Sequence, residues 1–218
     1  MKSIYDYINE ASLLDNAISE ASLLDIEGTI ENGEADIKKN LIEKFIKDNY
    51  SPCNFTISDK PNKDGLYEVD ADDVFVKIWS ATDKKFTSLT NGIFTWNNIE
   101  YRFDCNGSYI TSLEGAPKKV GAYFDCNSCK NLKDLKGSPE FVGGNFTCEM
   151  CNDLLSLEGA PKIVGGDFNC RFCKSLKSLK GVPKTVNGDF ICYKCAKEFR
   201  TDSIKKLSKI KGLIFNNG

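Results

Sequence analysis

Apolar residues in the second half of the chain recur with a period of 22 residues. The block has the pattern Val-x-Gly-x-Phe-x-Cys-x-x-Cys-x-x-Leu-x-x-Leu-x-Gly-x-Pro, and successive blocks begin at Val120, Val142, Val164 and Val186. The alternation from the valine to the first cysteine predicts a short strand with these residues on one buried face. The two leucines are expected to point into the same core, and Gly-x-Pro ends the coil because proline lacks the N–H that a ladder needs. Repetition at such a period indicates a solenoid of stacked coils.

This block resembles the leucine-rich repeat, L-x-x-L-x-L-x-x-N/C-x-L, in a variant with phenylalanine and cysteine in the strand. The resemblance covers roughly Val74 to Cys195. It implies a repeat solenoid that is mainly β, with short parallel strands, and about six coils in residues 73–196. The first two coils are degenerate, as terminal repeats often are: Val74 takes the valine position of one, and Ile99 and Phe103 take the valine and phenylalanine positions of the next.

The flanking segments are expected to cover the ends of the array. Residues 35–50 have apolar side chains at helical spacing, and residues 54–58 and 66–69 alternate like two strands joined by a turn. Residues 34–72 are therefore predicted to form a small α/β N-terminal cap, a helix plus a hairpin, that protects the open edge. Residues 197–218 are predicted to be a short helical C-terminal cap, with a helix that starts at Thr201 and has Ile204 and Leu207 on one face.

The ten cysteines allow two interpretations. Repeated Cys-x-x-Cys spacing fits a four-thiolate zinc site, for which the candidate ligands are Cys170, Cys173, Cys192 and Cys195. The other interpretation is a ladder of buried free thiols. It is favoured because the valines, phenylalanines and leucines recur with the same period, and because Ser108 fills an equivalent position. No cofactor is then expected, and structural zinc remains the alternative. Disulfides are not expected, because no secretory signal is visible.

Composition and charge narrow the function. Residues 1–36 contain nine Asp and Glu against one Lys, so this segment has a charge of −8 and the remainder +6, within a net charge of −2. The lysines of the array fall at turn positions, so nucleic acid is not expected as a partner. No apolar run approaches the ~18 residues of a membrane span. Histidine is absent and no catalytic motif is present, so we expect no catalytic residues and a non-enzymatic, protein-binding role.

The expected binding surface is the exposed face of the strands, since repeat proteins usually bind along such a face. Interface hot spots favour Tyr and Arg, so Tyr123, Arg171, Phe172 and Tyr193 are the best anchors. An ordinary solvated sheet face is the alternative. The predicted face consists of Tyr123, Asp125, Asn145, Thr147, Asp167, Asn169, Asp189 and Tyr193.

The N-terminal 33 residues are expected to be a flexible acidic leader, in which an eight-residue string that starts at Ile8 returns almost unchanged at Ile18, each copy containing Glu-Ala-Ser-Leu-Leu-Asp. Residues 1–12 resemble the capsid-targeting sequence of internal head proteins of T-even-like bacteriophages, and the array is similar to those of tailed-phage proteins. This resemblance implies packaging through the phage head scaffold, a location in the host cytoplasm and inside the phage head, and proteolytic cleavage after the glutamate of Ile-x-Glu. The implied cleavage sites are Glu10/Ala11 and Glu20/Ala21. The alternative is a docking segment of a cytosolic interaction module that is never packaged.

Overall fold

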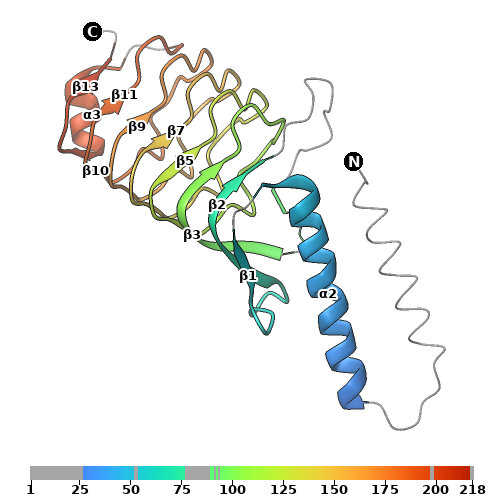
Figure 1. Cartoon of the computed structure of the whole chain (residues 1–218). Helices are drawn as coiled ribbons and strands as arrows, with labels where there is room; N and C mark the ends of the chain where they lie inside the picture. The colour runs from blue at the N-terminus through green and yellow to red at the C-terminus, as the bar shows by residue number, and fades with distance from the viewer. Residues whose placement is uncertain are drawn as a thin grey trace. The chain divides into compact units, whose positions relative to one another are not determined.

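The array forms a parallel β-solenoid, in agreement with the predicted fold class (Figure 1). The structure is a computed structural model that describes residues 27–51, 54–76, 89–90, 92, 94–196 and 199–216. The chain divides into two units, Met1–Asn49 and Tyr50–Gly218. In the first unit the residues that the structure describes form one helix, and the second unit contains the hairpin and the solenoid.

Helix α2 (Glu27–Asn49) begins earlier than the sequence predicts, within residues 1–33, the predicted leader. Ile42, Phe45 and Ile46 are buried, at the spacing that predicted a helix. Two glutamates pair with lysines one turn later, Glu34 with Lys38 and Glu43 with Lys47, the favourable order on a helix surface. No described helix is long and apolar enough to cross a membrane.

The second unit begins with the predicted hairpin. Strands β1 (Phe55–Ile57) and β2 (Tyr67–Phe75) pair antiparallel. Strand β2 runs past the expected end of the cap at residue 72 and pairs in parallel with β3 (Phe94–Asp104).

The register of β2 against β3 corrects one prediction. Val74 lies beside Phe103, so it belongs to the phenylalanine column, and Ala71, beside Ile99, takes the valine column. The pairing is also irregular at two places, between Val69 and Ala71 and between Ala71 and Asp73, where β3 has one residue more than β2. Ile99 and Phe103 themselves lie beside Val120 and Phe124, as the repeat predicted. Most of the first degenerate coil lies outside the described residues.

Each regular coil contains two short strands where the sequence predicted one. The glycines that follow the valine in two of these coils approach the preceding coil closely: a Cβ on Gly143 would lie 2.0 Å from the carbonyl oxygen of Gly121, and one on Gly165 would lie 1.9 Å from that of Gly143. Both strand columns start on β3, which is long enough to support them side by side. The strands are β4 (Lys119–Val120), β5 (Tyr123–Asp125), β6 (Phe141–Val142), β7 (Phe146–Thr147), β8 (Ile163–Val164), β9 (Phe168–Asn169), β10 (Thr185–Val186) and β11 (Phe190–Ile191).

The core consists of columns of identical residues, one from each coil, as predicted. The valines, phenylalanines and leucines of the block are buried. The phenylalanine rings of neighbouring coils stack with centroids 5.2–5.4 Å apart and interplanar angles of 2–12°. Such aromatic pairs contribute about 0.5–1.5 kcal/mol each beyond their burial. The stack comprises Phe103, Phe124, Phe146, Phe168 and Phe190.

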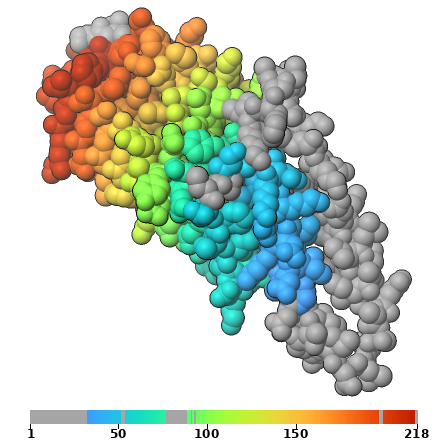
Figure 2. Space-filling view, viewed as in Figure 1, coloured from blue at the N-terminus to red at the C-terminus, as the bar shows by residue number. Residues whose placement is uncertain are grey.

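The C-terminal segment adds one further coil. Helix α3 (Thr201–Leu207) starts where the sequence predicted, and Ile204 is buried, but Leu207 is 56% exposed because the helix ends there. Strands β12 (Lys209–Ile210) and β13 (Ile214–Phe215) then extend the two strand columns in register with β10 and β11. The successive coils are visible as bands from green to red in Figure 2.

Candidate functional site: a binding surface along the coils

Except for Tyr193, which lies in the turn after β11, the predicted binding residues lie along the β5–β7–β9–β11 strand column, in two rows (Figure 1). One row precedes the buried phenylalanine of each coil and begins with Tyr123, which is 53% exposed. The other row follows the phenylalanine and begins with Asp125, which lies beside Thr147. Apart from Tyr123, the predicted residues are half-buried. The structure therefore brings these residues together, but it does not leave all of them free to bind a partner.

The first row has a structural role that the sequence did not reveal. The side-chain oxygens of Asn145, Asp167 and Asp189 each accept the backbone N–H of the next coil, at 2.8, 2.8 and 2.7 Å. Each oxygen lies beside a glycine of that coil, and a Cβ on Gly166 or Gly188 would approach it to 2.1 or 2.2 Å. The sequence signal for this role is the Gly-Asn or Gly-Asp pair that recurs before the phenylalanine of successive blocks. The glycine of one coil leaves space for the side-chain oxygen of the Asn or Asp in the preceding coil.

The second row shapes the turn that follows each strand. Asp125 accepts the backbone N–H of Asn127 at 2.8 Å, and Asn169 accepts that of Arg171 at 3.1 Å. Burial raises the pKa of the Asp125 carboxyl above its usual range, and the hydrogen bond from Asn127 opposes this shift. The side-chain oxygens of Asp125 and Asn169 are thus engaged within the coils.

A cluster of large side chains lies at the end of these strands, in the turn between the two cysteines of a block. We call Met150, Arg171, Phe172, Tyr193 and Lys194 the strand-end patch. The Arg171 Nε lies 2.9 Å from a carboxylate oxygen of Glu149, and its Nη1 donates a hydrogen bond of 3.0 Å to the Tyr193 hydroxyl. The Tyr193 and Phe172 rings meet edge to face at 5.5 Å.

The charges of the strand-end patch lie close to its aromatic rings. The Lys194 Nζ lies 5.1 Å from the centre of the Phe172 ring, and the Arg171 guanidinium carbon lies 5.7 Å from the same centre. Both distances fall within the range of cation–π attraction. Met150, 44% exposed, precedes Phe172 by one repeat and adds an apolar surface.

The backbone of the strand-end patch is left-handed at non-glycine residues. Ser128, Met150, Phe172 and Lys194 occupy one position of successive blocks and have φ values of 57°, 58°, 59° and 56°. This conformation costs roughly 1–2 kcal/mol for a residue with a Cβ, and strain of this kind concentrates at functional sites. Sequence reasoning identified Arg171, Phe172 and Tyr193 but missed Met150 and Lys194, because the left-handed turn is not visible in the side-chain pattern.

The cysteines form the predicted ladder of buried thiols, and all nine that the structure describes are free. The second cysteine of each block donates a hydrogen bond to the backbone carbonyl of the first cysteine in the preceding block: Cys129 to Cys105, Cys151 to Cys126, Cys173 to Cys148 and Cys195 to Cys170, at 3.1–3.2 Å. The hydrogen bond from the Cys170 thiol lowers the pKa of Cys195.

These hydrogen bonds compete with the alternative interpretation, in which the cysteines bind zinc. A thiol that donates is protonated, whereas zinc binds thiolates. Of the four candidate ligands, Cys173 and Cys195 donate to carbonyls. Within the described residues, no three or more Cys, Asp or Glu side chains are arranged to hold a metal ion.

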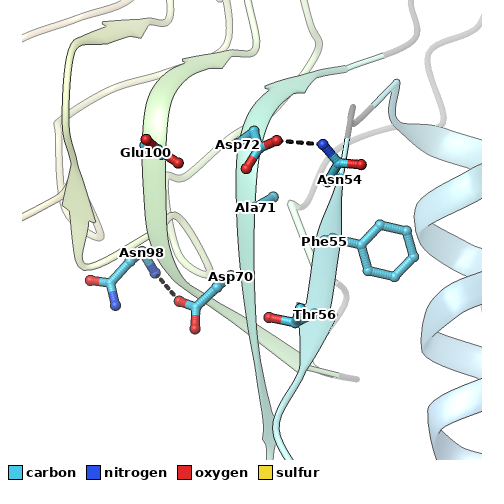
Figure 3. A pocket seen from close by; sticks show the side chains of 8 residues that line it. All are labelled: Asn54, Phe55, Thr56, Asp70, Ala71, Asp72, Asn98 and Glu100. Atoms are coloured by element: carbon cyan, nitrogen blue, oxygen red, sulfur yellow. Dashed lines mark hydrogen bonds between the residues drawn. The ribbon is translucent and has the colours of Figure 1, made fainter.

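A shallow hollow of about 230 Å³ lies over β1, β2 and β3 (Figure 3). Two of its three carboxylates hold the strands together: Asp70 accepts the backbone N–H of Asn98 at 2.8 Å, and Asp72 accepts the side-chain N–H of Asn54 at 2.6 Å. The hollow is therefore a polar depression between paired strands.

The fold and this surface define a repeat protein of the parallel β-solenoid class with coils of 22 residues. Comparisons with models of protein families, with curated proteins and with solved structures give no match. The implied cleavage residues Glu10, Ala11, Glu20 and Ala21 lie outside the described residues.

Proposed function

We propose that this chain is a non-enzymatic repeat protein that binds a protein partner through the strand-end patch. The observation that carries the proposal is the arrangement of Arg171, Phe172 and Tyr193, which contact one another at the end of a sheet face. Tyr and Arg dominate the binding energy of protein interfaces. The patch supplies both types, with Met150 as an adaptable apolar neighbour.

The side chains of the strand-end patch are already held in place before a partner binds, which supports this patch as the binding site. Ordering a long side chain on binding costs about 0.5–1.5 kcal/mol, and Arg171 is already held by Glu149 and by the Tyr193 hydroxyl. Phe172 is held between the edge of Tyr193 and the Lys194 ammonium. A partner that presents an apolar side chain beside a carboxylate fits this combination of aromatic and cationic groups.

The remainder of the sheet face is a weaker candidate. Asn145, Asp167 and Asp189 already accept backbone N–H groups, so a partner would have to compete with the contacts that hold the coils together. Tyr123 retains a large exposed ring and is the anchor that this part of the face offers.

The experiment compares two phenylalanine deletions. Tagged full-length protein captures partners from a lysate of the source, with quantitative mass spectrometry as the readout, and Phe172→Ala is compared with Phe141→Ala. Phe141 is 39% exposed on β6, outside the strand-end patch. The proposal expects Phe172→Ala to reduce recovery of a specific partner at least about tenfold, the size of a 1.4 kcal/mol hot spot, and Phe141→Ala to leave it unchanged. Equal recovery with both variants, at equal thermal stability, would refute the assignment.

For the leader we propose that it marks the chain as an internal head protein of a bacteriophage, delivered to the host with the genome. The support is the sequence resemblance of residues 1–12 and the two Ile-x-Glu sites, Glu10/Ala11 and Glu20/Ala21. Mass spectrometry of the N-terminus in purified particles is the test, and a new terminus at Ala11 or Ala21 is expected. An intact Met1, or absence from particles, would leave the alternative of a cytosolic interaction module.

A further inference from the structure

The thiol ladder consists of repeated pairs, and one pair differs from the others. In the three regular pairs, Cys126/Cys151, Cys148/Cys173 and Cys170/Cys195, the partners are 25 residues apart, and the later thiol donates to the backbone carbonyl of the earlier cysteine. The cysteines of the first two pairs are fully buried. Among the described cysteines, Cys195 is the one that is only partly buried.

In the last pair the Cys195 sulfur lies 3.2 Å from the Cys170 carbonyl oxygen. As in the other pairs, the two thiols are close enough to affect each other: the neighbouring Cys195 raises the pKa of Cys170, and Cys170 lowers the pKa of Cys195. Cys170 is fully buried. The pair therefore combines a partly accessible thiol, Cys195, with a shielded one in the preceding coil, Cys170, which is the arrangement of an attacking and a resolving cysteine.

We propose that Cys170 and Cys195 are a site of reversible oxidative modification, at which hydrogen peroxide closes a disulfide between neighbouring coils. The Cys195 thiolate attacks one peroxide oxygen, the O–O bond breaks, and the leaving hydroxide takes up a proton to become water. The Cys170 sulfur then attacks the sulfenic sulfur, a second water leaves, and the S–S bond forms. Two thiols are oxidised by two electrons and one peroxide is reduced to two waters. A thiol reductant reverses the step.

Because Cys170 and Cys195 lie next to the strand-end patch, a disulfide between them would affect that patch. Cys170 immediately precedes Arg171 and Phe172, and Cys195 immediately follows Tyr193 and Lys194. The disulfide would join covalently the two segments that form most of the strand-end patch. The chemistry does not depend on the proposed binding function, so either proposal can fail without the other.

Trypsin distinguishes the relevant disulfides. Cleavage after Lys194 separates Cys192 from Cys195, and cleavage after Arg171 separates Cys170 from Cys173. A bond between Cys170 and Cys195 links the peptide of residues 163–171 to that of residues 195–197, whereas a bond within the Cys126/Cys151 pair links residues 120–130 to residues 137–162.

The experiment treats the folded full-length chain with hydrogen peroxide, blocks free thiols with N-ethylmaleimide in denaturant, and maps the tryptic peptides. The expected product is the 163–171/195–197 disulfide, formed at least about tenfold faster than any disulfide between interior coils, because those thiols become accessible only when the coils open. Cys195→Ser should abolish it and Cys151→Ser should not. Thermal unfolding of both variants is the control that measures whether they fold.

Three results would overturn the proposal. The first is that both cysteines remain free at peroxide concentrations that oxidise glutathione. The second is that interior pairs oxidise at the same rate as the last pair. The third is that Cys195 is converted to sulfinic acid while Cys170 stays reduced.

Discussion

The middle of the solenoid and the hairpin end of the same unit build their cores from aromatic rings in opposite ways. In the middle, Phe124, Phe146 and Phe168 stack almost parallel, at 2° and 3°. At the hairpin end, Trp96 meets Phe94 at 80° and Phe103 at 74°, so the rings there pack edge to face. Where a coil has a similar coil on each side, each phenylalanine ring repeats the position of the ring in the coil before it, and the stacked rings fill the core. Where the repeat ends, different residues have to fill a space of different shape.

The backbone shows the same contrast. Gly165 in the middle leaves no room for a Cβ against the preceding coil, whereas Gly65 in the hairpin turn has nothing within 4 Å of that position and is glycine because its φ is +76°. One glycine is required by contact between coils and the other by local conformation. Three substitution experiments test these differences.

The largest effect is expected in the phenylalanine stack. Phe146→Ala removes a fully buried ring that stacks on two neighbours and should lower the free energy of unfolding by about 4 kcal/mol. Phe124→Ala and Phe168→Ala should cost the same within about 0.5 kcal/mol, since their surroundings repeat. Urea denaturation measures the three values, with the partly exposed Phe141→Ala as the control. Three clearly unequal values would show that the middle coils are not energetically equivalent.

The second effect concerns the glycines. Gly165→Ala forces a Cβ against the Gly143 carbonyl and should destabilise the protein by about 2–3 kcal/mol. Gly65→Ala meets no atoms and should cost only the roughly 1–2 kcal/mol of the left-handed backbone. Midpoints of urea unfolding give the comparison. A cost for Gly165→Ala no greater than that for Gly65→Ala would mean that the coils can separate enough to accept a methyl group.

The same contrast explains what the sequence could predict. The columns of Phe146, Cys148 and Leu154 were predictable, because a residue that recurs at a fixed offset has the same environment in every coil. The position of Val74 was not, because the register of β2 against β3 is irregular where β3 has extra residues, and the spacing of apolar residues does not show this.

The candidate site was predictable only in part, for a related reason. Asp167 and Asp189 occupy an exposed offset, so the hydrophobic pattern marks them as available, although they accept backbone N–H groups. Met150 and Lys194 escaped notice because a left-handed backbone at non-glycine residues is set by the stacked turns and not by local propensity. Polar contacts between coils depend on which atoms meet after stacking, and the period alone does not specify them.

The smallest effect should come from Asp125, which tests whether the polar row differs energetically from the core beneath it. Burial raises the pKa of its carboxyl in the folded protein, so the folded state binds this proton more tightly than the unfolded chain does. The contribution to stability is therefore full at pH values below about 4, the pKa of an unfolded aspartate, and is lost as the pH rises through the folded pKa. Asp125→Asn keeps an oxygen to accept the Asn127 N–H but carries no charge. It should be more stable than the parent chain at neutral pH and equal to it below about pH 4, by urea denaturation across this range. A stability difference that does not change with pH would show that desolvation of the carboxylate is not what distinguishes this row.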